Sequence, residues 1–197
     1  METSDATQGA LDAAEGAHEA VQKEKNASIE SRFPFVEPSW IHLSEAAYNG
    51  DVAGVERLIA AKADVDGHDW DGFTALVYAA QEGHARCVDL LVAAKANIEV
   101  RGVYDANPLL LAAAHGHAEC ARLLIAAKAN IHTRGIRGAT PLIAAATHGH
   151  TDCVQLLVAV KSDIEATDDE GFTSLMRAAK KGNTACLQLL AAADADV

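Results

Sequence analysis

The sequence predicts an all-α solenoid of about five units, each a hairpin turn followed by two short helices. The main observation is a glycine that recurs at an interval of 33 residues along the chain. The same interval separates four cysteines and four lysines. The residues concerned are Gly50, Gly83, Gly116, Gly149 and Gly182; Cys87, Cys120, Cys153 and Cys186; and Lys62, Lys95, Lys128 and Lys161. Because three residue types keep one period without an insertion, the chain is read as a stack of equivalent units.

Composition agrees with this fold class and excludes several functions. Of 197 residues, 50% are hydrophobic but only 5% are aromatic, so small aliphatic side chains dominate and favour closely packed helices. The 16 basic and 28 acidic residues give a net charge of −12, which opposes binding to nucleic acid or to an anionic membrane surface. No apolar run approaches the roughly 18 residues of a membrane span, so direct membrane insertion is not expected.

The second unit shows the elements in order. Residues 69–74 carry turn chemistry, and Thr74 is placed to cap the helix that follows. This helix is expected over 75–82 and ends at Gly83, where glycine permits a left-handed backbone. A second helix is expected over about 85–94, with apolar residues on one face. Those residues are Val88, Leu91 and Val92.

The sequence predicts that the chain divides into two segments. Residues 37–197 form the repeat domain, with units at about 37–68, 69–101, 102–134, 135–167 and 168–197. Residues 1–36 lie outside the period and are expected to be an extension that is partly disordered or docked. Within it, Arg32-Phe33-Pro34-Phe35-Val36 places two aromatic residues around a proline, a pattern typical of an extended anchor that folds back on the first unit or inserts into a partner.

The units resemble the ankyrin repeat. The fourth unit carries the family pattern most fully, as Gly138-Ala139-Thr140-Pro141-Leu142 with Ala144-Ala145, Gly149-His150 and Leu156-Leu157. The third and fifth units repeat much of it, and the resemblance extends from about residue 37 to the C-terminus. It implies an ankyrin-repeat solenoid of hairpin-helix-turn-helix units and a role in protein–protein interaction.

Three departures from the family pattern matter. The histidine that closes its Thr-Pro-Leu-His tetrapeptide is absent, so the hydrogen bonds of that histidine must be lost or replaced. The glycine after the second helix is replaced by the periodic lysines and finally by Asp194, which costs about 1 kcal/mol wherever the backbone is left-handed. The last unit lacks a polar cap, so further repeats or a partner are expected to cover it. The residues in the histidine position are Ser44, Val77, Leu110, Ile143 and Met176.

No chemical site emerges from the cysteines, histidines or carboxylates. The cysteines occupy one position per unit, about 10 Å apart in a stack, which is too far for a disulfide or a shared zinc ion. The same spacing separates His115 and His148, which are expected to line a groove rather than bind one ion. Phosphate-loop and hydrolase motifs are absent from the sequence. We therefore expect no cofactor, no metal and no enzymatic activity.

The resemblance places partner binding on the hairpin tips and the exposed side of the first helices. Five of the nine aromatic residues map to this face, and aromatic residues and arginine are enriched at interface hot spots. For Phe73 the alternative is packing against a neighbouring hairpin. The candidate residues are Tyr48, Trp70, Asp71, Phe73, Glu82, Tyr104, His115, Ile136, Arg137, His148 and Lys181.

Three functions fit these observations. The first is a non-catalytic scaffold or adaptor, the second a permanent structural subunit of a large assembly, and the third an inhibitory subunit of an enzyme. A soluble monomer favours the adaptor over the fixed subunit, and an activity assay tests the inhibitor. The N-terminus contains Glu2 and Asp5 and no apolar stretch typical of a secretory signal, so an intracellular protein is expected, in the cytoplasm with the nucleus as the alternative.

Overall fold

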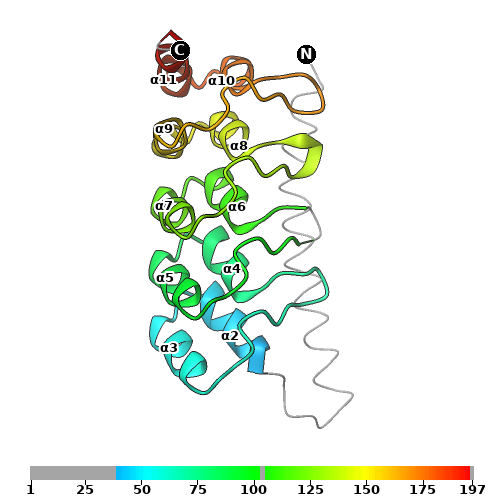
Figure 1. Ribbon diagram of the computed structural model, residues 1–197, viewed down its shortest axis with the longest axis vertical. Coiled ribbons are helices and arrows are strands. Elements are labelled where there is room, and N and C mark those ends of the chain that lie inside the picture. The colour runs from blue at the N-terminus through cyan, green and yellow to red at the C-terminus, as the bar shows by residue number, and fades with distance from the viewer. Residues whose placement is uncertain (1–38, 103–104, 196–197) are drawn as a thin grey trace. The chain divides into compact units, whose positions relative to one another are not determined.

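The structure is a computed structural model that describes residues 39–102 and 105–195. Within these residues the chain forms five helix pairs and one short 3₁₀ helix (Figure 1), as the all-α prediction requires. The elements are α2 (Ser39–Tyr48), α3 (Val52–Ala60), α4 (Ala75–Gln81), α5 (Ala85–Ala93), α6 (Pro108–Ala114), α7 (Ala118–Ala126), η1 (Ile136–Gly138), α8 (Pro141–His148), α9 (Thr151–Ala159), α10 (Ser174–Lys181) and α11 (Thr184–Ala195). The expectations for residues 1–36 and for Tyr104 lie outside the described residues.

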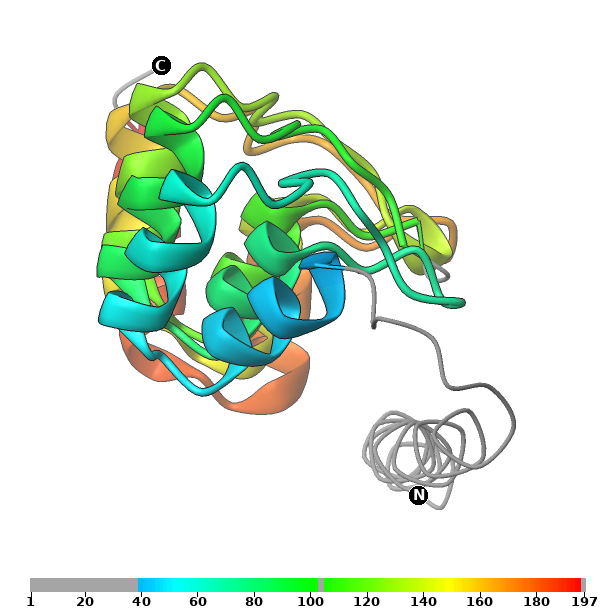
Figure 2. The same ribbon diagram turned by 90° about the horizontal axis from the view of Figure 1, so that it is seen from below.

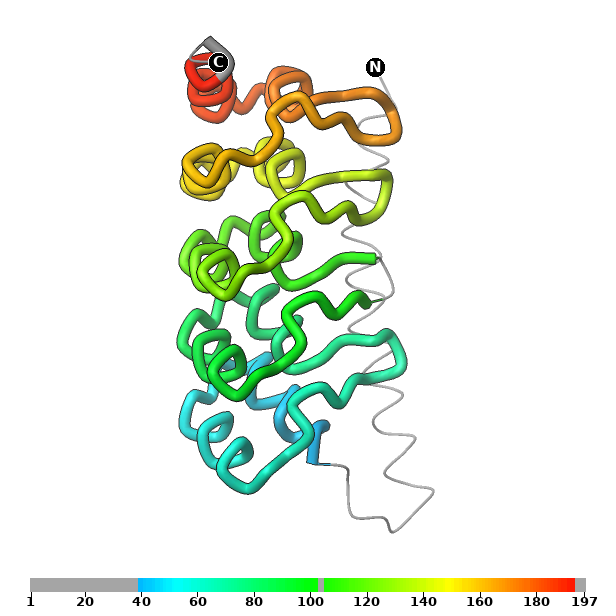
Figure 3. The backbone as a smooth tube through the Cα atoms, in the orientation of Figure 1, coloured from blue at the N-terminus to red at the C-terminus, as the bar shows by residue number. Residues whose placement is uncertain are grey.

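The helices of the repeat domain stack in two columns. One column contains α2, α4, α6, α8 and α10, which we call the inner helices, and the other contains α3, α5, α7, α9 and α11, the outer helices (Figure 1). Figure 2 shows the hairpin loops projecting to one side, next to the inner helices. Each helix contacts its counterpart in the next unit, so the units follow one another in chain order (Figure 3).

Local sequence explains where each inner helix begins. Thr74, Asn107, Thr140 and Thr173 each precede a helix with an extended backbone, and the side-chain oxygen accepts a hydrogen bond from the third residue along. For Asn107 that bond, from the Leu110 N–H to Oδ1, is 2.9 Å long. Such a cap satisfies a backbone donor that would otherwise have no partner. The predicted cap at Thr74 is confirmed.

The core consists of small and branched aliphatic side chains repeated in every unit. Over the first four units, each inner helix has one leucine that is fully buried. Pairs of fully buried alanines on α4, α6 and α8 let neighbouring inner helices approach closely. The leucines are Leu43, Leu76, Leu109 and Leu142, and the alanines are Ala79, Ala80, Ala112, Ala113, Ala145 and Ala146.

The periodic lysines have a left-handed backbone. The φ angles of Lys62, Lys95, Lys128 and Lys161 lie between 61° and 73°, as expected for the position that the family fills with glycine. Asp194, in contrast, lies inside α11, so the expectation of an equivalent turn there is wrong. The outer helix of the last unit runs past the point where the other outer helices end.

Replacing Lys95 with glycine is expected to raise the free energy of unfolding by about 1 kcal/mol, because glycine adopts a left-handed backbone without a clash at Cβ. Thermal unfolding followed by circular dichroism measures the effect. Ala94→Gly is the matched control, since Ala94 has a φ of −74° and gains nothing from glycine, so its melting temperature should fall. An unchanged or lower melting temperature for Lys95→Gly would contradict the expectation.

Candidate functional site

A buried carboxylate fixes the hairpin of the second unit to its inner helix. Asp69 Oδ1 accepts hydrogen bonds of 2.9 Å from the N–H groups of Asp71 and Phe73. The Tyr78 hydroxyl on α4 donates to Asp69 Oδ2 over 2.5 Å. Burial and this hydrogen bond raise the pKa of Tyr78, so the hydroxyl stays protonated and continues to donate. The hairpin that carries Trp70 is therefore held rigidly.

The last hairpin uses the same arrangement with a different partner. Asp168 Oδ1 accepts 3.0 Å bonds from the N–H groups of Glu170 and Phe172, and Arg177 Nε on α10 donates to Asp168 Oδ2 over 2.6 Å. The Arg177 guanidinium also lies 4.5 Å from the centre of the Phe172 ring. The family's histidine is missing from both units. Tyr78 in the second unit and Arg177 in the fifth each supply a side-chain hydrogen bond to the hairpin instead.

The third and fourth hairpins are joined to their neighbours instead. Arg101 donates to the carbonyl oxygen of Arg134 over 3.1 Å and to Thr133 Oγ1 over 3.2 Å. Arg134 in turn donates to the carbonyl oxygen of Thr167 in the next unit. Glycines stand where the other hairpins have the aspartate, at Gly102 and Gly135. The third, fourth and fifth hairpins are therefore connected to one another by hydrogen bonds.

Trp70 is the most exposed of the large hydrophobic residues that the structure describes. Its side chain is 77% exposed at the tip of the rigid second hairpin. Ile136 and Tyr48, also on the predicted face, are 43% and 39% exposed. The Tyr48 ring packs edge-on against Tyr78 at 5.8 Å, which connects the first unit to the second. Tyr48, Trp70 and Ile136 are thus available to a partner from three different units.

Phe73 differs from the prediction of an exposed contact. It is only 4% exposed, and its ring packs edge-on against Tyr78 at 5.6 Å. A Cβ at Gly102, on the next hairpin, would lie 2.2 Å from the Phe73 ring, so the absence of a side chain at Gly102 makes room for the phenyl group. Phe73 is a packing residue between two hairpins and is removed from the candidate face.

The other candidate residues lie in two places, on the hairpins and at the C-terminal ends of the inner helices. Asp71 and Arg137 lie on the hairpins, where Arg137 has a left-handed backbone and approaches Glu170 within 3.9 Å. The remaining residues follow one position of successive inner helices, at or just beyond the C-terminal end of each. They are Glu82, His115, His148 and Lys181.

The histidines of the Gly-His pairs connect the units structurally. His84 Nε2 donates to the carbonyl oxygen of Tyr48 over 2.9 Å, and His150 Nε2 donates to that of Ala114 over the same distance. Each ring covers the left-handed glycine of the preceding unit, where a Cβ would clash with it. His115 lies near this arrangement, its ring stacked on His117 with centres 6.3 Å apart. His84 and His150 thus connect successive units.

The pKa of His115 lies below its usual value, because burial and the neighbouring His117 and His150 oppose its charge more than Glu82 favours it. The unfolded chain then binds a proton more readily than the folded one, so stability should fall as pH drops below about 6.5, the usual histidine value. We expect His115→Asn to flatten this fall between about pH 7.5 and 5.5. Melting temperatures of both proteins across that range check it; parallel curves would contradict the expectation.

The cysteines are packing residues. All four are free and buried, and each lies in the first turn of an outer helix. Burial, reinforced by Glu119 and Asp152, raises the pKa of Cys120 and of Cys153 to about 11. Such thiols stay protonated and are poor nucleophiles and poor metal ligands. Across residues 39–102 and 105–195, no group of three or more His, Cys, Asp or Glu side chains is arranged to hold a metal ion.

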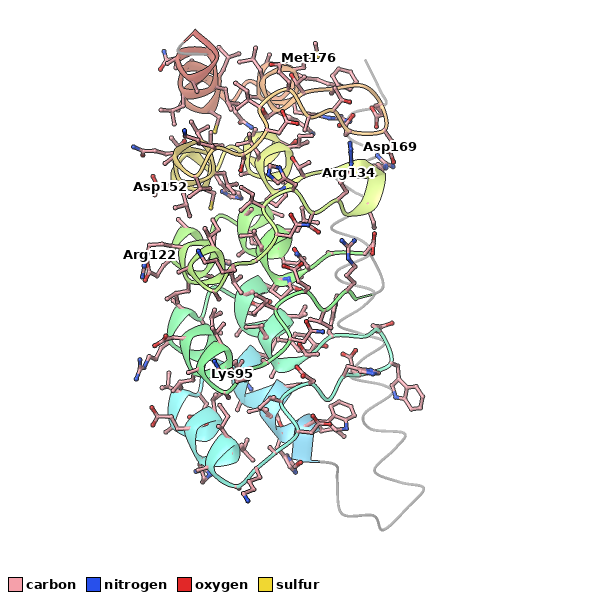
Figure 4. The ribbon with its side chains drawn as sticks, viewed as in Figure 1. Lys95, Arg122, Arg134, Asp152, Asp169 and Met176 are labelled. Atoms are coloured by element: carbon pink, nitrogen blue, oxygen red, sulfur yellow. The ribbon has the colours of Figure 1, made fainter. Side chains whose placement is uncertain are left out.

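The C-terminal end of the described stack has an apolar surface, which the sequence predicts only in part. Met176 is 50% exposed, whereas Val77, Leu110 and Ile143 at the same position are covered by the following unit. Ala179 is also exposed, although its counterparts in earlier units are fully buried. The sequence signal for this surface is an apolar residue in the last unit, Met176, at a position where the preceding three units bury their side chains. Figure 4 shows Met176 at this end of the stack.

Comparison with known proteins gives a family. The sequence model of a family described as "Ankyrin repeats (3 copies)" matches residues 43–135 and 109–197, which together span most of the chain. A search of the curated proteins finds no match. None of the helices in the described ranges is long and apolar enough to cross a membrane.

Proposed function

This chain belongs to the ankyrin repeat family, and from that premise we propose that it is a non-catalytic scaffold that binds a protein partner. The proposed surface, which we call the partner face, consists of the hairpin tips and the exposed side of the inner helices. Members of repeat families use such extended surfaces for recognition. The described candidate residues on it, apart from the buried Phe73, are Tyr48, Trp70, Asp71, Glu82, His115, Ile136, Arg137, His148 and Lys181.

The observation that carries the proposal is the exposure of Trp70 on a rigid hairpin. An indole that is 77% exposed leaves a large apolar area in water, which a bound partner would remove. The hydrogen bonds of Asp69 already fix the hairpin, so little conformational entropy is lost on binding. Tryptophan is also the type of residue most often found at interface hot spots.

Affinity purification from the source cell followed by mass spectrometry tests the proposal. Wild-type protein should capture a partner that Trp70→Ala does not, because truncation at a hot spot costs about 2 kcal/mol or more, roughly 30-fold in Kd. Arg122→Ala is the control, since Arg122 is exposed on the outer helix α7, away from the partner face, and pairs with Glu119 on the same helix. Retained capture by Trp70→Ala, with unchanged helical circular dichroism, would reject the proposal, and Tyr104→Ala extends the test to the adjacent hairpin.

The absence of catalysis is part of the proposal. The protonated thiols of Cys120 and Cys153 are poor nucleophiles, and the buried carboxylates of Asp69 and Asp168 are already engaged by hairpin hydrogen bonds. An intracellular site of action also belongs to it, because free buried thiols are typical of proteins from reducing compartments.

A second candidate function is a permanent subunit of a larger assembly. It is favoured by the apolar C-terminal end formed by Leu175, Met176 and Ala179, which resembles the surface that each earlier unit buries against the next. Size-exclusion chromatography distinguishes the two. A soluble monomer supports the scaffold, whereas aggregation that Met176→Lys abolishes supports the fixed subunit. Inhibition of an enzyme captured by the partner face would be a special case of the scaffold.

A further inference from the structure

We infer that the inner-helix part of the partner face binds an extended segment of its partner that is basic at one end and acidic at the other. This inference rests on the proposed function and adds the chemistry of the bound segment. It comes from the order of charges along the inner helices, which changes sign from the first units to the last. Because the units stack in chain order, the order of charges in the sequence is also their order in space.

The acidic end lies on the first two units. Glu45 is exposed on α2, one helical turn before Asn49, and Glu82 follows α4 at the position equivalent to Asn49. Neither carboxylate forms an ion pair among the residues that the structure describes. The exposed Trp70 lies on the second hairpin beside Asp71, and an indole next to carboxylates suits a lysine or arginine side chain. Two kinds of side chain therefore favour a basic group at this end.

The basic end lies on the last unit. Lys180 and Lys181 end α10, and neither forms an ion pair within the described part of the chain. Lys180 lies 4.6 Å from the centre of the Phe172 ring, so the aromatic face positions the ammonium group. Arg177 already binds Asp168 and Glu170, which leaves the two lysines as the charges available to a partner.

The middle units carry no full charge on this row. The half-buried positions on α6 and α8 hold Leu111, Ala114 and Thr147, with the buried Ala144 and with His115 beside them. Leu111 and Ala114 pack against Ala144 in one small apolar cluster. A bound segment is therefore expected to be uncharged and apolar between its two charged ends.

The charged side chains on the hairpins do not cancel the order of charges along the inner helices. They largely pair with one another, as Arg101 with Asp105 at 2.9 Å and Arg137 with Glu170 at 3.9 Å. Asp169 is the opposing carboxylate near the basic end, and Figure 4 shows it at the outer tip of the last hairpin rather than on a helix. Three units separate Glu82 from Lys181, about 30 Å at a helix spacing near 10 Å, which an extended chain of about nine residues spans.

Synthetic peptides test the inference directly. The bipolar peptide has a block of lysines and a block of glutamates separated by about nine alanine and leucine residues; two controls carry lysines, or glutamates, at both ends. Fluorescence anisotropy at low ionic strength should give a Kd at least about tenfold lower for the bipolar peptide than for either control, and added salt should weaken it. Equal binding of all three peptides, or binding of none, would overturn the inference.

A change of specificity provides the stronger test. Glu45→Lys with Glu82→Lys makes both ends of the row basic, so the peptide with two acidic ends should become the preferred ligand. Glu56→Lys with Asp152→Lys changes the net charge equally, but on the outer helices, where Figure 4 shows Asp152 pointing away from the hairpins. This control must still prefer the bipolar peptide. If both variants come to prefer the peptide with two acidic ends, the change is an effect of net charge and the inference is overturned. If Trp70→Ala still loses the cellular partner while no peptide is preferred, the partner face stands and only the bipolar segment is rejected.

Discussion

Gly116→Ala is expected to lower the free energy of unfolding by about 3 kcal/mol, although it adds a single methyl group. About 1 kcal/mol comes from the left-handed backbone of Gly116, whose φ is 82°. The rest comes from overpacking, since the new Cβ would lie 2.5 Å from His150 Nδ1. His150 must then move and weaken its hydrogen bond to the carbonyl of Ala114, which joins the third and fourth units.

Gly182→Ala separates these two causes. Gly182 occupies the same position in the last unit, with a φ of 75°, but a Cβ there meets no atom within 4 Å. We expect this control to cost only the backbone contribution of about 1 kcal/mol. Denaturant unfolding followed by circular dichroism measures both variants. Equal losses for Gly116→Ala and Gly182→Ala would show that the histidine contacts between units contribute little.

Arg177→Met should also destabilise the protein by about 3 kcal/mol, because it leaves a buried carboxylate without its counter-charge. The Arg177 guanidinium lies 2.5 Å from Asp168 Oδ2, and the side chains are only 14% and 3% exposed. Methionine keeps much of the length and the apolar part of the side chain, so the loss reports on the charge. Hydrogen exchange should show the loss first in the last unit, which within the described residues is supported by its own contacts and those with the fourth unit.

Tyr78→Phe is the matched experiment in the second unit. It removes the hydroxyl that donates to Asp69 while retaining the ring contacts with Tyr48 and Phe73. The expected cost is about 1.5 kcal/mol, that of one hydrogen bond to a charged acceptor, because Asp69 still receives two backbone hydrogen bonds. Unfolding free energies of both variants, measured in parallel, check the order; a larger loss for Tyr78→Phe than for Arg177→Met would contradict this account of the hairpins.

Much of the fold could be predicted because the repeat shows every element several times. The period of Gly50, Gly83 and their equivalents set the number of units, and Thr74 set the start of an inner helix. The left-handed backbone at Lys95 followed from its position in the repeat rather than from any preference of lysine. Features that all units share are local or periodic, and such features can be read from a sequence.

The features that the sequence did not predict belong to single units. The sequence alone left exposure and packing as alternatives for Phe73, because its burial depends on Gly102 of the next hairpin, which makes room for the ring. The carboxylate bonds of Tyr78 and Arg177 join residues that only the folded hairpin brings together. Asp194 continues a helix that ends earlier in the other units. These features depend on contacts across units or on the end of the stack, where the period gives no guidance.

Amide hydrogen exchange of the protein with and without its captured partner tests the central claim most directly. If the partner face is the binding surface, exchange should slow at the second hairpin, residues 69–73, and at the C-terminal ends of α4, α6, α8 and α10. The outer helices α5, α7 and α9 should exchange at unchanged rates, since they lie in the other column of the stack (Figure 1). Protection confined to the outer helices, including α11, would contradict the claim.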